Sequence, residues 1–134
     1  MTTLLAIDPG ARHCGWALFY DGSLADAGEL SPDDMLTRAR HRGASELVVE
    51  EFRLYPHTSC SLAYDPLKTV EVIGALRLIA QWRGAEFITQ PAAIKRPAGA
   101  MVRRRGLPTL RRGGHARDAQ LHGYYRLLST GRIK

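Results

Sequence analysis

Short apolar runs separated by turn residues fill the first 30 positions of the chain. Residues 3–8, 13–20 and 23–30 have the length and apolar content of strands. Pro9-Gly10 interrupts the first run, and Asp21-Gly22 is a strong signal for a hairpin turn. We therefore predict three consecutive strands that pair antiparallel.

Helical and strand patterns alternate after this meander. Ser31-Pro32 is typical of a helix start, because a serine cap and a proline in the first turn suit the free N–H groups there. Strands that follow helical crossovers are expected to run parallel to the first strand. The chain is thus expected to form one α/β domain, residues 1–134: a mixed five-stranded sheet, three strands antiparallel plus two parallel, flanked by helices. The later elements are expected over residues 32–43 (helix), 46–52 (strand), 66–83 (helix), 85–90 (strand) and 115–128 (helix).

Residues 97–114 are rich in glycine, proline and arginine. Because glycine and proline interrupt regular structure, we predict a mobile basic loop here, after a single helical turn over 92–96. Residues 53–65 show no clear period and are also expected to form a loop.

The predicted helix 66–83 is apolar around most of its circumference. A helix of this kind needs cover on two sides. The sheet would cover one side, and a second subunit would cover the other.

Carboxylates stand at the ends of two predicted strands, and a third lies in the last helix. Asp8 ends the first strand, Glu50 or Glu51 ends the fourth, and Asp118 follows His115 by one helical turn. Parallel strands end at one edge of a sheet, where such folds place their sites. Buried carboxylates at one point repel one another, and divalent cations relieve this repulsion. The pattern predicts a metal-dependent enzyme with two Mg²⁺ or Mn²⁺ ions per active site.

Some assignments stay open at this stage. Only one of two adjacent acids on a strand can face the site, and we favour Glu50 over Glu51. His115, Asp118 and His122 share one face of the last helix. His115 would bind metal, orient the attacking water, cap the helix or bind phosphate. His122 is expected to pack or to support the site rather than to bind metal.

The chain carries a net charge of +6, and this charge is unevenly distributed. Residues 1–94 contain eight basic and twelve acidic side chains, whereas residues 95–134 contain eleven basic side chains and a single acid, Asp118. A basic surface around one acid suits a polyanion whose phosphate meets a metal. No apolar run approaches the ~20 residues of a membrane span, so we expect no membrane association. Cys14 and Cys60 lack metal-site spacing, and we expect free thiols in a reducing cytoplasm.

Four short motifs follow one another along the chain. They are Leu5-Ala6-Ile7-Asp8-Pro9-Gly10 with Gly15-Trp16-Ala17, then Val48-Val49-Glu50, Ala93-Ile94-Lys95 and His115-Ala116-Arg117-Asp118-Ala119. Together they resemble the motifs of the RuvC family of Holliday-junction resolvases, within the RNase H-like superfamily. The match spans nearly the whole chain. The compact length and the Arg-rich segment 103–112 are similar to those of phage members.

The resemblance implies a homodimer that cuts two opposed strands of a four-way DNA junction with Mg²⁺ or Mn²⁺. Asp8, Glu50, His115 and Asp118 would be catalytic residues and metal ligands. Lys95 would stabilise the charge that develops on the scissile phosphate. The helix 66–83 would contribute to the dimer interface.

The resemblance also implies DNA contacts outside the acidic site. The family places an aromatic side chain near the junction centre, from the loop after the second acid, and Phe52, Tyr55 and Tyr64 are the candidates here. Arginines would hold phosphates, largely without reading sequence. The expected phosphate contacts are Arg103, Arg104, Arg105, Arg111 and Arg112.

We therefore expect a structure-selective endodeoxyribonuclease that hydrolyses phosphodiesters in Holliday junctions and other branched DNA. It would act in the cytoplasm, that of a bacterial host if the protein is phage-encoded. One alternative is an RNase H-like ribonuclease that acts on RNA–DNA hybrids or precursor ribosomal RNA. Another is a DNA-binding protein without nuclease activity, which would leave the three acids unexplained.

Overall fold

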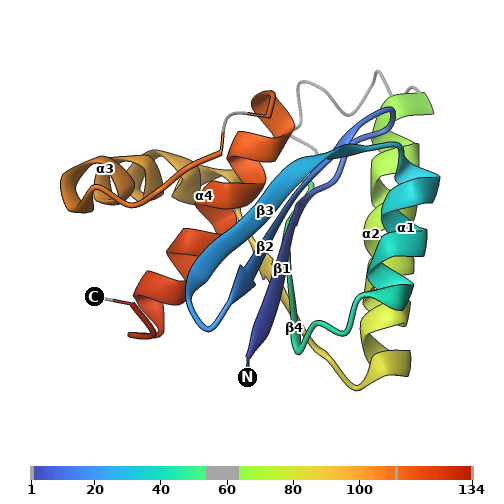
Figure 1. Cartoon of the computed structure of the whole chain (residues 1–134). Coiled ribbons are helices and arrows are strands. Elements are labelled where there is room, and N and C mark those ends of the chain that lie inside the picture. The colour runs from blue at the N-terminus through green and yellow to red at the C-terminus, as the bar shows by residue number, and fades with distance from the viewer. Residues whose placement is uncertain (1, 54–63, 111, 134) are drawn as a thin grey trace.

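The computed structural model describes residues 2–53, 64–110 and 112–133. Its sheet has five strands in the order β3-β2-β1-β4-β5 (Figure 1). The first three strands pair antiparallel, and β1–β4 and β4–β5 pair parallel, so the predicted mixed sheet is confirmed. The strands are β1 (Thr3–Asp8), β2 (Cys14–Tyr20), β3 (Ser23–Leu30), β4 (Glu46–Glu50) and β5 (Glu86–Gln90).

The predicted hairpin between β2 and β3 is present. Asp21 and Gly22 both take positive φ angles, 47° and 85°. Two consecutive residues of this conformation form the tight turn whose twist matches that of the paired strands. The Asp-Gly sequence thus sets the register of the antiparallel half of the sheet.

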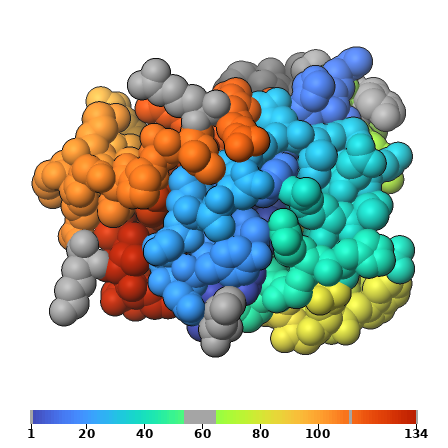
Figure 2. Space-filling view, in the orientation of Figure 1, coloured from blue at the N-terminus to red at the C-terminus, as the bar shows by residue number. Residues whose placement is uncertain are grey.

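Two helical layers cover the two faces of the sheet (Figure 1). Helices α1 (Pro32–His41) and α2 (Tyr64–Arg83) pack on one face, around Leu47 and Val49 of β4. The opposite face carries η2 (Ala92–Ile94), α3 (Lys95–Arg105) and α4 (Gly114–Ser129). In the space-filling view, the hairpin strands lie between the C-terminal layer in orange and red and the layer that contains α1 (Figure 2). None of the helices in the described part of the chain is both long and apolar enough to span a membrane.

The alternation of side chains along the strands determines which acids face α4. Leu4 and Ala6 of β1 and Val48 of β4 belong to the core beneath α3 and α4. Because side chains alternate with a period of two, Asp8 and Glu50 continue the same face at the strand ends. This face therefore changes from apolar to acidic where β1 and β4 end.

The predicted mobile loop over residues 97–114 is wrong for its first half, because residues 95–105 form α3. Pro97 lies in the first turn, where its missing N–H is not needed by the helix. Ala98 and Val102 are buried against the core beneath α4, and this burial stabilises a segment that its composition makes a poor helix. Gly106 ends the helix with a φ of 61°, and Leu107 donates to the Val102 carbonyl at 3.0 Å in a Schellman-type cap.

The described part of the connection from α3 to α4 is tied to α4. The backbone N–H of Leu110 donates to Oε1 of Gln120 at 2.7 Å, and Nε2 of Gln120 donates back to the Leu110 carbonyl at 2.6 Å. The hydroxyl of Tyr124 donates to the Pro108 carbonyl. Residues 107–110 and 112–113 thus have irregular structure with defined anchors.

Candidate active site

The parallel pairing of β1 and β4 brings two of the predicted acids together. Ile7 lies opposite Val49, so the next residues, Asp8 and Glu50, leave the sheet side by side. Only 6% of Asp8 and 9% of Glu50 are exposed. Two carboxylates at this depth need compensating charge or hydrogen bonds from the covering layer.

Helix α4 supplies part of that layer because it approaches the sheet very closely. Gly15 of β2 lies opposite Asp8, and a Cβ atom at this position would collide with the backbone of His115. The first turn of α4 is also held by Glu29, whose Oε1 accepts a hydrogen bond from the His115 N–H at 3.2 Å. These contacts place His115 and, one turn later, Asp118 beside the strand ends.

The predicted catalytic residues form one continuous set of contacts. Nδ1 of His115 lies 2.8 Å from Oδ2 of Asp8. Nζ of Lys95 lies 3.0 Å from Oε1 of Glu50 and 3.0 Å from Oδ2 of Asp118. We call Asp8, Glu50 and Asp118, together with His115 and Lys95, the carboxylate cluster. The structure thus brings all five predicted residues to one place.

The cluster holds more negative charge than its partners neutralise. Burial, a hydrogen bond with Glu50 and the charges of Glu50 and Asp118 raise the pKa of Asp8 to about 9, and Lys95 offsets them only in part. Burial also acts to raise the pKa of Glu50, but the neighbouring His122, Asp8 and Lys95 outweigh it and hold that pKa well below its usual range. Asp8 and Glu50 therefore share one proton at neutral pH.

Lys95 is held charged by the same acids. Burial alone would lower the pKa of its ammonium group, but hydrogen bonds to Glu50 and Asp118 raise it. The ammonium is therefore a permanent cation between two carboxylates.

The donor set of the cluster suits a hard divalent cation. Within the residues that the structure describes, no three His, Cys, Asp or Glu side chains are gathered as a ready-made metal site. Lys95 instead lies between Glu50 and Asp118, and a proton resides on the Asp8–Glu50 pair. Both supply positive charge that a divalent ion would also supply. Three carboxylates and one imidazole fit Mg²⁺ or Mn²⁺ in ligand chemistry.

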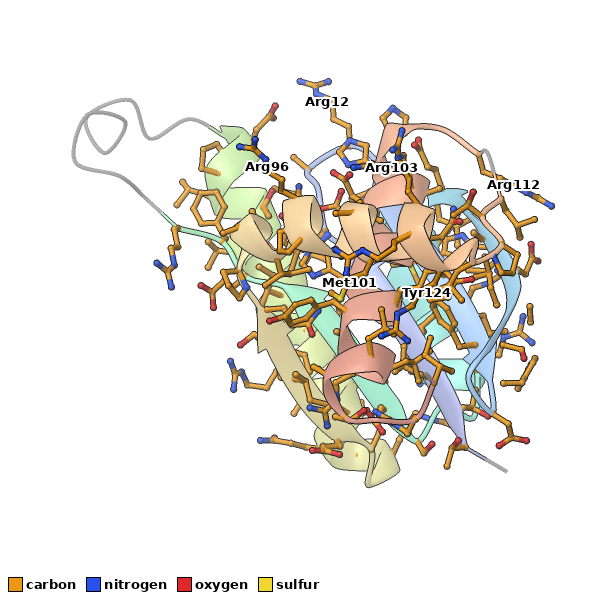
Figure 3. The ribbon with its side chains drawn as sticks, turned by 90° about the vertical axis from the view of Figure 1, so that its left-hand side faces the viewer. Arg12, Arg96, Met101, Arg103, Arg112 and Tyr124 are labelled. Carbon is orange, nitrogen blue, oxygen red and sulfur yellow. The ribbon has the colours of Figure 1, made fainter. Side chains whose placement is uncertain are left out.

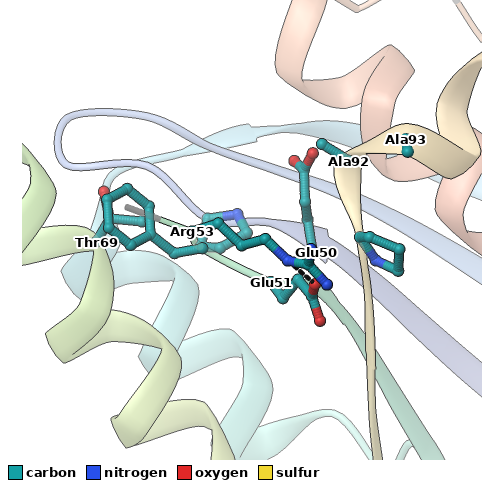
Figure 4. A pocket seen from close by; sticks show the side chains of 9 residues that line it. Glu50, Glu51, Arg53, Thr69, Ala92 and Ala93 are labelled. Atoms are coloured by element: carbon teal, nitrogen blue, oxygen red, sulfur yellow. Dashed lines mark hydrogen bonds and ion pairs between the residues drawn. The ribbon is translucent and has the colours of Figure 1, made fainter. Parts of the chain in front are cut away.

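Glu51 contacts Arg53, whereas Glu50 contacts Lys95, so the two adjacent acids have different partners. Glu50 and Glu51 both line a cavity of about 320 Å³, together with Phe52, Arg53 and Thr69 among others (Figure 4). Oε1 of Glu51 accepts a hydrogen bond from Nε of Arg53 at 2.7 Å. Phe52 is thus near the site but outside the cluster.

A basic groove runs from the cluster between α3 and α4. Its volume is about 590 Å³, and its lining includes Lys95, Arg96, Arg103, Arg117 and Asp118. Figure 3 shows Arg96 and Arg103 on α3, with α4 behind it. An adjoining hollow of about 240 Å³ is lined by Arg103, Arg117 and Arg112, among others. We call these two spaces together the α3–α4 groove.

The other predicted DNA contacts are placed less directly. Arg104 and Arg105 are exposed in the last turn of α3 and do not line the groove. Arg112 lies 3.5 Å from Asp26 of β3. The predictions for Tyr55 and Arg111 fall outside the described residues.

Sequence reasoning missed four residues at the site. Arg96 and Arg117 adjoin the motif residues Lys95 and Asp118, so the local run of basic charge was the available signal. Gln90 ends β5 beside Glu50, and a polar residue at the end of an apolar strand was the same signal that singled out Asp8. No sequence signal connects Glu29 with His115, because their contact joins distant segments.

Comparison with known proteins identifies the type of fold that carries this site. No family model and no curated protein matches the sequence. The strand order, the mixed pairing and the acids at the ends of β1 and β4 define an RNase H-like α/β fold. The fold is similar to that of solved RuvC structures, in agreement with the resemblance of the sequence motifs. The chain superposes on Thermus thermophilus RuvC in complex with a Holliday junction substrate, with a TM-score of 0.68, 18% identity and coverage of 100% of this chain and 99% of the other. A second Thermus thermophilus RuvC structure gives a TM-score of 0.65, 19% identity and 99% coverage of both chains.

Proposed function

We propose that the protein is a metal-dependent endonuclease that resolves four-way DNA junctions and cuts related branched DNA. The observation that carries this proposal is the convergence of Asp8, Glu50 and Asp118, from three distant segments, in one cluster in which Asp8 and Glu50 are buried. The RuvC-like fold supports it, and so does the α3–α4 groove that leads to the cluster. A structure-selective DNA substrate accounts for all three features.

The carboxylate cluster would perform the hydrolysis. Asp8, Glu50 and Asp118, with His115, would hold two Mg²⁺ or Mn²⁺ ions. Such ions supply activation of a water molecule and stabilisation of the leaving 3′ oxygen. His115 is hydrogen-bonded to Asp8 and lies at the mouth of the site, where it would hold or orient the attacking water. Lys95 would donate to the scissile phosphate and stabilise the charge that develops there.

The α3–α4 groove would hold the DNA strand that enters the site. Arg96, Arg103 and Arg117 line it, and Asp118 of the cluster is the acid in the same lining. Arginine contacts to phosphates position a duplex or strand without reading its sequence. Binding is therefore expected to weaken steeply with salt.

A homodimer would present two clusters to two opposed strands. Val70, Leu78 and Trp82 of α2 are 49%, 46% and 70% exposed. With Gly74 between them, they follow one another at intervals of four and form one stripe along the helix. Leu67, 57% exposed, lies at the start of the same stripe. An exposed apolar stripe of this length supports the proposal that α2 forms the subunit interface.

One cleavage assay tests the activity. A synthetic four-way junction, an RNA–DNA hybrid and a structured RNA are incubated with the protein in Mg²⁺, Mn²⁺ or EDTA. We expect paired nicks in the junction with either metal and none in EDTA. Asp8→Asn is expected to abolish cleavage and to bind the junction normally. Preferential cleavage of the hybrid or the RNA would contradict the proposal, and so would cleavage by Asp8→Asn at the wild-type rate.

Light scattering tests the dimer separately. The wild-type protein is expected to have twice the mass of the chain, and Trp82→Arg is expected to shift it toward the monomer. Arg40→Glu, a charge change at an exposed position of α1 outside this stripe, is the control and is expected to leave the mass unchanged. A monomeric wild-type protein at all concentrations would exclude this interface.

A further inference from the structure

A buried polar pair lies directly behind the carboxylate cluster. It consists of Gln90, the last residue of β5, and His122, in the middle of α4. Gln90 is 6% exposed and His122 is completely buried. A glutamine and a histidine in such a position cost stability unless their polar atoms are paired.

Strand register connects this pair with the site. Gln90 lies opposite Glu50 in the β4–β5 ladder, so the two side chains project from neighbouring strands on the face that α4 covers. His122 lies over both of them. Its Nδ1 is 3.0 Å from Nε2 of Gln90, and its Nε2 is 3.7 Å from Oε1 of Glu50.

The hydrogen bonds of Gln90 determine where the proton of His122 resides. Nε2 of Gln90 lies 3.0 Å from the backbone carbonyl oxygen of His122, which can only accept. The amide must therefore present its NH₂ group, rather than its oxygen, to α4. The second hydrogen of that NH₂ group points to Nδ1 of His122, which has to be the acceptor. The imidazole proton is thereby assigned to Nε2.

The protonated Nε2 atom points at Glu50. It is buried and has no hydrogen-bond partner, since 3.7 Å is longer than a hydrogen bond. Lys95 approaches the same oxygen, Oε1 of Glu50, at 3.0 Å. A small rotation of the Glu50 carboxylate would complete a hydrogen bond from His122, and nothing else in the described surroundings satisfies this N–H.

We propose that Gln90 is a positioning residue that locks His122 in its Nε2–H form, so that His122 orients the Glu50 carboxylate for cation binding and catalysis. The catalytic part of this inference rests on the proposed function. Groups that orient a metal-ligating carboxylate commonly change metal affinity about 10–100-fold when they are removed. Gln90 and His122 act through Glu50 and do not touch the substrate.

Two substitutions each remove one of the groups through which Gln90 acts on Glu50. Gln90→Met keeps the length of the side chain but removes the donor that selects the tautomer. His122→Leu removes the N–H that points at Glu50. His122→Gln is the conservative variant, because the amide NH₂ of glutamine reaches about as far as Nε2 of histidine and can donate to the same oxygen.

Gln120 offers a matched control. It is also a completely buried glutamine on α4, and its amide binds the backbone of Leu110 rather than a residue of the cluster. Gln120→Met is expected to lower the thermal midpoint, as Gln90→Met does. It is expected to leave the His122 tautomer and the Mn²⁺ affinity unchanged within about twofold.

The tautomer is read first, by nitrogen NMR of the histidine rings in the unmodified, metal-free protein. We expect the Nε2–H form for His122, and a mixture or the Nδ1–H form in Gln90→Met. A wild-type Nδ1–H ring overturns the proposal. This measurement needs no variant, so the proposal can fail even if a substituted protein does not fold.

Mn²⁺ titration calorimetry and single-turnover cleavage of the junction are then compared. Gln90→Met and His122→Leu are expected to bind Mn²⁺ about tenfold more weakly, and His122→Gln within about threefold of wild type. Their cleavage rates at saturating metal are expected to fall in the same order, with unchanged junction affinity. Wild-type Mn²⁺ affinity in both Gln90→Met and His122→Leu would show that the pair is only structural. A wild-type protein that binds Mn²⁺ but cuts no junction would overturn the proposed function, while the tautomer and affinity changes would still support the role of Gln90.

Discussion

Strand β4 carries a carboxylate at each end, the half-buried Glu46 and the buried Glu50, and α4 passes over both, yet the two ends differ in charge balance. Glu46 lies between two arginines. Arg132 donates to its two carboxylate oxygens at 2.5 and 3.0 Å, and Nε of Arg126 donates at 3.1 Å. Burial acts to raise the pKa of Glu46, but the hydrogen bonds from Arg132 and Arg126 outweigh it and lower that pKa. This end of the strand is neutralised by the protein itself.

The end at Glu50 lacks such neutralisation. There Glu50, Asp8 and Asp118 share a single permanent cation, Lys95, within the described residues. The consequence is the rise of the Asp8 pKa to about 9, caused first by burial and then by the neighbouring acids. The two ends therefore differ in charge balance: at one end a neutralised acid ties α4 and the C-terminal segment to the sheet, and at the other end three acids outnumber the single lysine between them.

The largest expected effect is a difference in cleavage rate between variants of the neighbouring acids Glu50 and Glu51. Glu50→Gln should reduce junction cleavage about a thousandfold, because several kcal/mol of transition-state stabilisation depend on this carboxylate. Glu51→Gln changes the adjacent carboxylate, which faces the opposite side of the strand and binds Arg53, and should leave the rate within about twofold. Single-turnover cleavage in Mg²⁺ measures both. Equal losses in the two variants would mean that Glu50 has no special role.

The neutralised end should contribute more to stability. Glu46→Gln should lower the free energy of unfolding by about 2 kcal/mol, because it leaves Arg126 and Arg132 partly buried without their carboxylate. Arg53→Gln, which removes only an exposed ion pair, should change it by less than about 0.5 kcal/mol. Urea denaturation in EDTA measures both values. If Glu46→Gln lowers the free energy of unfolding no more than Arg53→Gln does, the two ends of β4 do not differ in this way.

Removal of the Asp8 carboxyl group should raise the free energy of unfolding, whereas removal of the Glu46 carboxylate should lower it. Asp8→Asn should raise the unfolding free energy of the metal-free protein by about 1 kcal/mol, because a neutral amide replaces a carboxyl group that folding forces to take up a proton. The thermal midpoint in EDTA should rise by a few degrees. Destabilisation by this variant would show that the cluster is already balanced without metal.

The last prediction concerns the pH dependence of stability. The pKa of Asp8 rises from 3.8 to about 9 on folding, so at neutral pH the folded protein holds a proton that the unfolded chain releases. Stability without metal should then decrease as the pH rises from about 6 to 9, and it should be lower at the alkaline end. Thermal midpoints in EDTA should show this decline for the wild type and a flatter profile for Asp8→Asn. Parallel profiles would assign the decline to other groups.

The predictable part of the fold is local. The Asp21-Gly22 turn, the Ser31-Pro32 helix start and the apolar runs of β1 and β4 follow from short-range preferences, and the structure contains each of them. Helix α3 was missed because its residues favour a helix only when Ala98 and Val102 are buried. Composition reports intrinsic preference, and burial against α4 overrides it.

Some residues of the candidate site could also be recognised from the sequence, and others could not. Asp8 was recognisable because a carboxylate that ends an apolar strand is unusual, and the period of two meant that only one of Glu50 and Glu51 could face the site. The role of Gln90 was not visible, because it depends on the register between β4 and β5 and on the turn of α4 that lies above them. The same holds for the two arginines that surround Glu46, which come from a segment some 80 residues away.

The sequence by itself determined which segments are strands, where acids end them and that the positive charge gathers in the last third of the chain, because these properties depend on neighbouring residues. The tertiary structure decided which acids meet, which cations neutralise them and which remain in excess. That outcome depends on distances between segments far apart in the chain, and electrostatic and hydrogen-bond energies change strongly over a few ångströms.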